Sequence, residues 1–363
     1  YWYMERFWGI SGRGNIDSAL DIHASQHAFN EVREYIERLT WDSVPRLDTL
    51  FIDYLGAKDT AYNRAVCRKS FTAAVTRAMI PGYKYDNMVI LAGPQGIGKS
   101  TLLDKMSRGW FNDSIRTFEG KDASELLQGV WLVEVSELHA FRKTDVARIK
   151  QFLSLRADRY RAAYGRHVSE LPRQCVFFGS TNTTDFLQDT TGNRRFWPVD
   201  VGEQPHAKTV WRDLTDDVID QLWAEAKARW QAGESLYLSG DVEQEAKIKQ
   251  EEHREVSARE GLIAAFVEKQ VPADWAKWPI DRRRDYWCGA TRTPDGQELE
   301  LVDRDRIAAV EIWCELFNGN VREMKPADTR EINAILARLD GWKRSGTVIR
   351  VGPYSVQRGF VRA

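Results

Sequence analysis

Apolar side chains recur at helical spacing through the first part of the chain. In the stretch HAFNEVREYIERLTWD, which begins at His27, they fall on every third or fourth position. A second amphipathic run, RAVCRKSFTAAVTRAM, ends just before Pro81-Gly82, a pair that interrupts helices. This periodicity predicts helices, and we assign residues 1–84 to an N-terminal helical collar domain.

From Asp86 onward, short apolar runs alternate with helical segments. The runs lie at residues 88–92, 130–133, 175–178 and 196–199. Continuous apolar runs of this length are typical of strands buried on both faces of a parallel sheet. Strands that alternate with helices predict an α/β fold. We therefore expect a three-layer α/β core over residues 85–235, which closes with a helix over residues 214–231.

The last third of the chain is less regular. We assign residues 236–302 to a helical connector, and the charged stretch 241–258 within it predicts a solvated helix. Residues 303–363 read as a helix, a second helix and two short strands around Gly346 and Pro353. That order of elements is the order of a winged helix.

Composition narrows the class of protein. The 363 residues suffice for two or three domains, and 43% apolar with 29% charged residues is ordinary for a globular chain. No apolar run approaches the roughly 18 residues of a membrane helix. The four cysteines form no CxxC pair, which favours a reducing compartment. We expect a cytoplasmic protein without a membrane partner. The start, YWYMERFWGI, predicts a cut inside a longer protein.

The strongest chemical signal is GPQGIGKS at residues 93–100, which matches G-x-x-x-x-G-K-[ST]. An apolar run precedes it and the helical stretch STLLDKMS follows, which is the context that this phosphate-binding loop requires. Lys99 reaches the β- and γ-phosphates of such a nucleotide, and the Ser100 hydroxyl ligates Mg²⁺. A glycine-rich turn without a ligand is the alternative. The expected ATP-binding residues are Gly93, Pro94, Gln95, Gly96, Ile97, Gly98, Lys99, Ser100 and Thr101.

An ATPase of this kind also needs an acidic group at the end of a neighbouring strand. The stretch VWLVEVSEL supplies two, Glu134 and Glu137. We expect Glu134, together with Ser100, to hold Mg²⁺, and Glu137 to activate the attacking water. Side chains three apart in a strand point to opposite faces, so Glu137 can act only if the strand ends at or just after Glu134. Two ordinary exposed glutamates are the alternative, and we assign no other metal.

Polar groups beside the next two apolar runs are further candidates. CVFFGSTN ends in a polar tip, where Asn182 can orient water or contact the γ-phosphate, although strands also end in Asn for reasons of turn formation alone. Arg194 and Arg195 follow a Gly-Asn turn in TTGNRRFWPV. One of them is a candidate for the arginine that an oligomeric ATPase presents to its neighbour's γ-phosphate. A salt bridge or a DNA contact is the alternative.

Two segments are locally basic although the net charge is −1. Residues 142–173 hold nine Lys or Arg against three acidic residues, with tyrosines among them. This mixture suits single-stranded nucleic acid, and packing on a neighbouring subunit is the alternative. Residues 331–363 hold six basic against two acidic residues, and a winged helix there would read a duplex or bind a protein. The candidate DNA contacts are Arg159, Tyr160, Arg161, Tyr164, Arg166, His167, Lys343 and Arg344.

Taken in order, these stretches resemble the virulence-associated E family of phage and mobile-element proteins, which is related to superfamily 3 helicases. The resemblance covers about residues 28–235. It is carried by REYIERLTWDSVPRLDTLFIDYLG, GPQGIGKSTLL, WLVEVSEL, DRYRAAYG, PRQCVFFGSTN, GNRRFWPV and DQLWAEA.

The resemblance implies an AAA+-like P-loop core that works as a ring, usually hexameric, on DNA, often with a primase domain upstream. Lys99 and Ser100 match the Walker A positions, Glu134 the Walker B acid and Asn182 the sensor. Arg194 or Arg195 matches the arginine finger, and residues 158–168 lie where superfamily 3 helicases carry a basic DNA-binding hairpin. Two adjacent acids are usual at the Walker B strand, whereas here Val135 and Ser136 separate them.

These features together predict an ATP-dependent DNA helicase or translocase of phage or mobile-element replication, in the cytoplasm of a bacterial host. Its cofactors would be ATP and Mg²⁺. Its partners would be single-stranded DNA in a central channel, further copies of the chain, and an upstream primase domain or host replication factors. The alternative is a nucleotide-gated switch that binds DNA or protein without unwinding.

Overall fold

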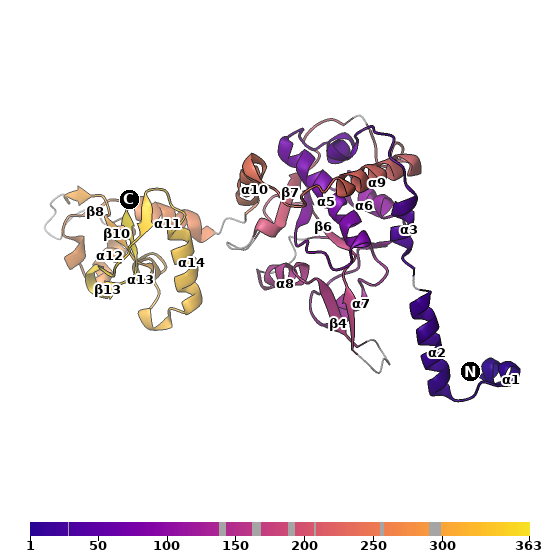
Figure 1. The fold of residues 1–363 in the computed structure, drawn as a ribbon. Coiled ribbons are helices and arrows are strands. Elements are labelled where there is room, and N and C mark those ends of the chain that lie inside the picture. The colour runs from indigo at the N-terminus through magenta and orange to yellow at the C-terminus, as the bar shows by residue number, and fades with distance from the viewer. Residues whose placement is uncertain are drawn as a thin grey trace. The chain divides into compact units, whose positions relative to one another are not determined.

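The computed structural model describes residues 1–27, 29–137, 143–161, 168–187, 193–206, 208–254, 258–289 and 299–363. Contacts between Cα atoms divide the chain into two compact units, residues 1–255 and 256–363. Figure 1 labels the elements of both units. The described part of the chain contains no helix long and apolar enough to cross a membrane.

The first unit is built on a five-stranded parallel sheet with the strand order β2-β3-β6-β1-β7 (Figure 1). The strands are β1 (Met88–Ala92), β2 (Phe111–Asn112), β3 (Leu132–Val135), β6 (Val176–Thr181) and β7 (Phe196–Asp200). The four predicted apolar runs correspond to β1, β3, β6 and β7, although β3 begins two residues later than predicted. The α/β class with a parallel sheet is therefore confirmed. Strand β2 was not predicted, because two residues are too few to form a pattern.

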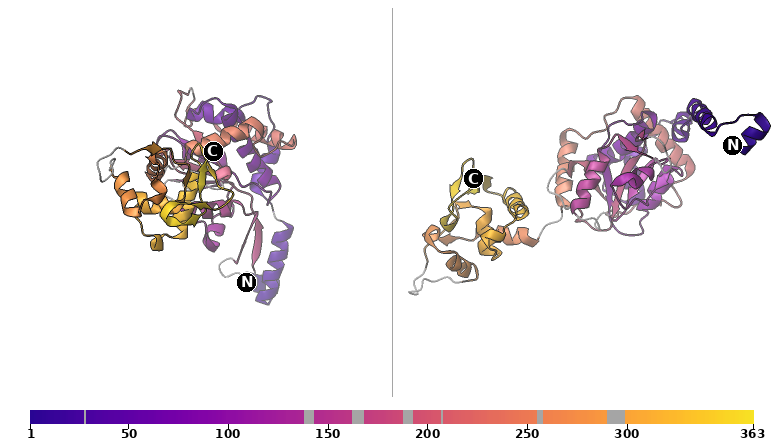
Figure 2. Two further views of the ribbon diagram at one scale, coloured as in Figure 1. Left: turned by 90° about the vertical axis from the view of Figure 1, so that its left-hand side faces the viewer. Right: turned by 90° about the horizontal axis from the view of Figure 1, so that it is seen from below.

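Helices cover both faces of this sheet, an arrangement that can be followed in Figures 1 and 2. Alternate strand residues face opposite sides, so Val89 and Phe178 enter one hydrophobic core while Ile90 and Phe177 enter the other. The first core is covered by α3 (Glu31–Arg38), α4 (Leu50–Leu55), α5 (Ala61–Met79), α6 (Lys99–Ser107) and α9 (Asp216–Gln231). The second is covered by α7 (Gly120–Glu125) and α8 (Lys143–Leu153). Burial on both faces explains the uninterrupted apolar runs.

Helices assigned to the N-terminal collar pack directly on the sheet. The ring of Phe71 on α5 lies 5.3 Å from Phe178 of β6 and 5.4 Å from Trp223 of α9, measured between centroids. Residues before and after position 84 thus share one hydrophobic core. Helical periodicity locates helices but does not say what they pack against. Two further helices, α1 (Trp2–Trp8) and α2 (Arg13–Gln26), precede α3.

The charged helix predicted as a solvated connector is α10 (Gly240–Glu252), and this prediction was wrong about its surroundings. The helix packs against the edge strand β7. The Gln250 side chain donates a hydrogen bond to the carbonyl of Phe196 at 2.8 Å, and Lys249 pairs with Asp200 at 3.0 Å. The few buried side chains of α10 cover the edge of the sheet at β7, which would otherwise be open. Because the helix has few apolar residues, its sequence does not predict this contact.

A two-stranded antiparallel hairpin, β4 (Ala157–Tyr160) and β5 (Ser169–Pro172), stands between α8 and β6. The resemblance to superfamily 3 helicases predicted a hairpin here. Arg173 fixes its base, since its guanidinium donates to both carboxylate oxygens of Asp158, at 2.7 and 2.8 Å. Both side chains are almost fully buried. Because the Arg173 side chain is buried in this ion pair, it does not contribute to a basic surface. The excess of basic residues counted over residues 142–173 is therefore larger than the excess of positive charge exposed to solvent.

The second unit contains a three-stranded antiparallel sheet in the order β10-β14-β11. Ile263, Ile332 and Phe360 belong to its main core. Arg283 is fully buried and pairs with Glu311 at 3.2 Å and with Glu315 at 2.8 Å. The elements are α11 (Ala258–Glu268), β8 (Val271–Pro272), η4 (Trp275–Lys277), α12 (Ile280–Trp287), β9 (Leu301–Val302), β10 (Arg306–Ile307), α13 (Ala309–Glu311), η5 (Ile312–Leu316), η6 (Val321–Glu323), α14 (Pro326–Leu336), β11 (Trp342–Arg344), β12 (Ile349–Arg350), η7 (Gly352–Tyr354), β13 (Val356–Gln357) and β14 (Phe360–Arg362).

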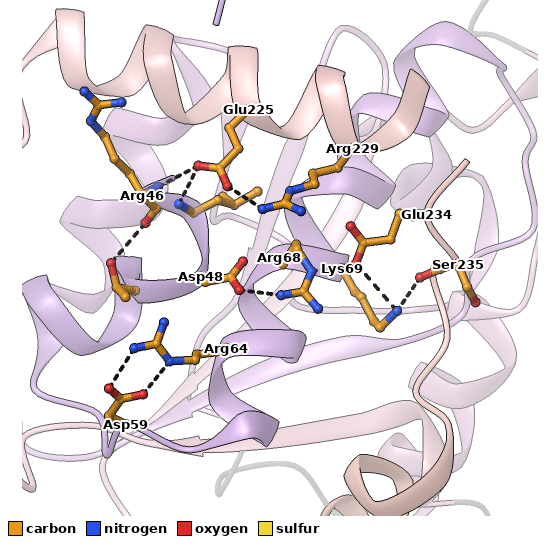
Figure 3. Close-up of polar contacts among 12 residues, drawn as sticks. Arg46, Asp48, Asp59, Arg64, Arg68, Lys69, Glu225, Arg229, Glu234 and Ser235 are labelled. Carbon is orange, nitrogen blue, oxygen red and sulfur yellow. Dashed lines mark hydrogen bonds and ion pairs between the residues drawn. The ribbon is translucent and has the colours of Figure 1, made fainter. Parts of the chain in front are cut away.

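A buried carboxylate joins the early helices to α9 (Figure 3). Glu225 is fully buried, and one of its oxygens accepts hydrogen bonds from the backbone N–H groups of Arg46, at 2.6 Å, and Leu47, at 2.9 Å. Its other oxygen accepts from Arg229 at 3.2 Å. Nearby, Arg68 of α5 donates to Glu234 at 2.6 Å and also contacts Asp48. These contacts replace water around groups that the fold buries.

We expect Glu225→Gln to destabilise the first unit by about 1–3 kcal/mol, because an amide NH₂ would face donors that now meet a carboxylate. The midpoint of urea unfolding at an unchanged m-value measures this loss. Glu243→Gln is the matched control, since Glu243 forms an exposed pair with Lys247 and its loss should cost about 0.5 kcal/mol or less. Equal midpoints for the two variants would contradict the role of Glu225.

Candidate functional site

A glycine-rich loop, residues 93–98, joins the carboxyl end of β1 to the first turn of α6. The backbone N–H of Gly93 donates to the carbonyl of Thr181 on β6 at 3.1 Å, which ties the loop to the neighbouring strand. Gly96 and Gly98 have φ values of 84° and 97°, which favour glycine. The first N–H groups of a helix have no partner within the helix. The loop and the start of α6 therefore form a concave, donor-rich turn of the kind that binds phosphate.

Lys99 lies inside this turn, and its side chain is largely buried. Its Nζ atom donates to the carbonyls of Gly93, at 2.6 Å, and Pro94, at 2.8 Å, and to Oδ1 of Asn182, at 3.1 Å. Burial lowers the pKa of Lys99, while the charge of Glu134 acts in the opposite direction. The predicted phosphate-binding lysine and the predicted sensor are thus in direct contact.

Glu134 of β3 is the second polar centre of the site and is almost fully buried. Its Oε1 atom accepts hydrogen bonds from Ser100, at 2.7 Å, and from Ser180, at 2.5 Å. A carboxylate and a hydroxyl held together provide the oxygen ligands that Mg²⁺ prefers, so these residues fit the predicted magnesium site. Ser180 was not among the predicted residues, although its position in the polar tip of β6 signalled it.

Glu137 lines the same cavity, of about 280 Å³, as Lys99, Ser100 and Asn182. Strand β3 ends at Val135, one residue after Glu134, so the condition that the sequence set for Glu137 is met. Its backbone is left-handed, with φ at 55°, a conformation that costs a non-glycine residue on the order of 1–2 kcal/mol. The turn brings its exposed carboxylate to the cavity rather than to the opposite face of the sheet.

Arg194 and Arg195 lie at the other end of the sheet. They form a 3₁₀ turn, η3 (Asn193–Arg195), directly before β7, whose first residue pairs with Met88 at the start of β1. The five residues of β1, roughly 13 Å of strand, separate that end of the sheet from the glycine-rich loop at residues 93–98. Arg195 contacts Asp86 at 3.4 Å and Ser154 at 3.1 Å, whereas Arg194 is exposed. Neither lies in the cavity around Lys99.

Some of the predicted DNA contacts lie on the hairpin. Arg159 and Arg161 are exposed, and Arg159 pairs with Glu170 across the hairpin at 3.4 Å. Tyr160 is half-buried on β4. In the second unit, Lys343 and Arg344 are exposed on β11. The predicted residues Tyr164, Arg166 and His167 lie outside the described part of the chain.

We expect Gly93→Ala to destabilise the fold more than Gly96→Ala does. A Cβ atom at Gly93 would lie 2.2 Å from the carbonyl oxygen of Val201, and moving that backbone would disturb the bond from Val201 N to Ala92 O, now 2.8 Å. A Cβ at Gly96 meets nothing within 4 Å, so only the left-handed backbone costs energy, about 1–2 kcal/mol. Thermal unfolding of both variants measures the difference, and equal midpoints would contradict the close approach of β7 to the loop.

Comparisons with known proteins place this architecture in a family. The model of the virulence-associated protein E-like domain matches residues 36–255, more than half of the chain. A search of curated proteins found no match. Solved structures with similarity include the apo structure of the NrS-1 C-terminal region (305–718), at 13% identity and TM-score 0.47, and its A form, at 13% and 0.46. Each alignment covers 91% of this chain and 78% of the other. The match over residues 36–255 shows that the chain belongs to the virulence-associated protein E-like domain family.

Proposed function

We propose that this chain is a Mg²⁺-dependent P-loop ATPase that drives movement along DNA, or its unwinding, in the replication of a phage or mobile element. One observation carries the proposal. Lys99, Ser100, Glu134 and Asn182, predicted separately as an ATPase set, meet at the carboxyl ends of β1, β3 and β6. A structural turn would need no buried carboxylate beside a buried lysine.

Each of these residues has a distinct part in the proposed reaction. Lys99 exchanges its bonds to the loop carbonyls for the β- and γ-phosphate oxygens of ATP. Ser100 and Glu134 would hold Mg²⁺, which would supply positive charge to the phosphate oxygens. Glu137 accepts the proton of the attacking water, and Asn182 orients that water against the γ-phosphate. The hydrogen bond from Ser180 keeps the Glu134 carboxylate turned toward Ser100.

The arginine finger of this proposal comes from another copy of the chain. Arg194 and Arg195 lie at the edge of the sheet opposite the cavity, so neither serves the site of its own subunit. Arg195 is held by Asp86 and Ser154, whereas Arg194 is exposed. We therefore assign the finger to Arg194 and a supporting position to Arg195. A ring, proposed as a hexamer, supplies the neighbour in every subunit.

The proposed DNA contacts follow from the hairpin and the second unit. Arg159 and Arg161 are exposed on a hairpin whose base is fixed by a buried ion pair, which suits a backbone grip on single-stranded DNA. Within residues 303–363, α13 and α14 are followed by β11 and β14 with the β12–β13 hairpin between them, and this order supports the winged-helix-like domain that we propose there. Lys343 and Arg344 on β11 are its proposed DNA contacts. An upstream primase domain or host replication factors are further proposed partners.

We expect Lys99→Ala to lower ATP turnover by roughly 10²–10³-fold, because it removes the cation that meets developing phosphate charge. Phosphate release with and without single-stranded DNA measures the effect, and DNA should stimulate only the unchanged chain. Lys247→Ala is the matched control, since Lys247 forms an exposed ion pair on α10. ATP turnover unchanged in Lys99→Ala would falsify the proposed activity. Equal rates of ATP turnover with and without single-stranded DNA would favour the nucleotide-gated switch.

A finger acting between subunits predicts complementation. Arg194→Ala should lower turnover by roughly 10³-fold or more, while its own phosphate site stays intact. Lys99→Ala has the opposite defect, a dead site and an intact finger. Mixing the two inactive variants should restore activity, because Lys99→Ala subunits supply Arg194 to their neighbours. A mixture as inactive as either variant alone would exclude this arrangement. The control mixes Arg194→Ala with a chain that carries both Lys99→Ala and Arg194→Ala, which supplies no finger and should restore nothing.

A further inference from the structure

An exposed tryptophan stands beside the phosphate-binding loop. Trp211 is 58% exposed and lines the same cavity as Lys99 and Ser100. The edge of its indole lies close to the loop, because a Cβ atom added to Gly98 would be 3.4 Å from its Cη2 atom. No motif around Trp211 distinguishes it among the fourteen tryptophans of the chain. Large aromatic side chains are usually buried, so its position at this cavity needs an explanation.

The turn that carries Trp211 is rigid. The carboxylate of Asp213 accepts a hydrogen bond from the backbone N–H of Thr209 at 2.7 Å, and the backbone N–H of Asp213 donates to the carbonyl of Thr209 at 2.9 Å. Arg212 adds an ion pair to Asp213 at 2.7 Å. Val210, next to the tryptophan, is fully buried against Gly98. The backbone of Trp211 is therefore fixed while its ring remains in solvent.

This turn is also fastened to the helix that begins at the phosphate site. Lys105 of α6 donates from Nζ to the carbonyls of Val210 at 2.9 Å, Trp211 at 3.4 Å and Leu214 at 3.1 Å. Lys99 and Ser100 form the first turn of the same helix. The backbone that carries the indole is thus tied to the helix that carries Lys99 and Ser100, an arrangement that suits a ligand with phosphates at one end and a flat ring at the other.

We propose that Trp211 is the platform on which the nucleobase of the bound nucleoside triphosphate stacks. The inference rests on the proposed function, because it identifies the base-binding part of the same site. Every base has a π-face, so stacking tolerates all four. Trp211 is the aromatic residue in the described lining of this cavity, whose other side chains include Lys99, Glu137 and Asn182. We therefore expect adenine, guanine, cytosine and uracil nucleotides to bind with affinities within about tenfold of one another.

Calorimetric titration of the full chain with Mg²⁺ and either ATP or inorganic tripolyphosphate tests the platform. Tripolyphosphate carries the phosphates without a base. Trp211→Ala should weaken ATP binding by about tenfold or more, in line with base–aromatic stacking, and should leave tripolyphosphate binding unchanged. Trp211→Phe should retain most of the ATP affinity. Trp8→Ala, which removes another exposed tryptophan, is the matched control and should change neither.

The outcomes separate this inference from the proposed function. Equal losses for ATP and tripolyphosphate in Trp211→Ala would mean that the residue only supports the loop, and unchanged ATP affinity would mean that it meets no base. Either result overturns the platform while leaving the ATPase intact, provided that Lys99→Ala abolishes binding of both ligands. An unchanged chain that binds neither ligand would overturn the proposed function and the platform together.

Discussion

The parallel pairing of β1, β3 and β6 is the constraint on which the candidate site depends. Parallel strands bring their carboxyl ends to one edge of the sheet. The register pairs Glu134 with Phe178 and Leu91 with Ser180. The polar residues at the ends of these three strands, which are far apart in the sequence, therefore lie side by side. The Glu134 carboxylate is buried there and accepts hydrogen bonds from the hydroxyls of Ser100 and Ser180. A buried carboxylate is costly unless it is hydrogen-bonded, and a slip in register would remove these partners.

Much of this arrangement could be predicted from the sequence, because the signals are local. The apolar run before GPQGIGKS and the helix after it place the loop between β1 and α6. The polar residues after the other runs place Glu134 and Asn182 at the same edge. The position of Glu137 depended on where β3 ends, and the observed end at Val135 satisfies the requirement.

Other features depend on contacts between distant residues, which no local pattern contains. The early helices share a core with the sheet through Phe71, and α10 covers β7 with few apolar side chains. Arg173 lies in a basic stretch of the sequence but forms a buried ion pair with Asp158. Trp211 lies next to Gly98 because Val210 packs against the loop and Lys105 of α6 binds the carbonyls of the same turn. In each case a residue's role is set by its partner rather than by its neighbours in sequence.

The two ends of β6 connect the proposed nucleotide site to the proposed DNA contact. Asn182 follows the carboxyl end of the strand, and the β4–β5 hairpin leads into its amino end through Arg173. Strand β6 is hydrogen-bonded to β1 on one side and to β3 on the other. The carbonyl of Cys175, just before the strand, accepts a bond at 2.7 Å from Arg77, which is itself buried in α5. A strand held in this way resists bending. Loss of the γ-phosphate would displace Asn182 under the proposed function, and a stiff β6 would pass most of that displacement on to the hairpin. Under the proposed function, β6 therefore connects the ATP site to the DNA contact within one subunit.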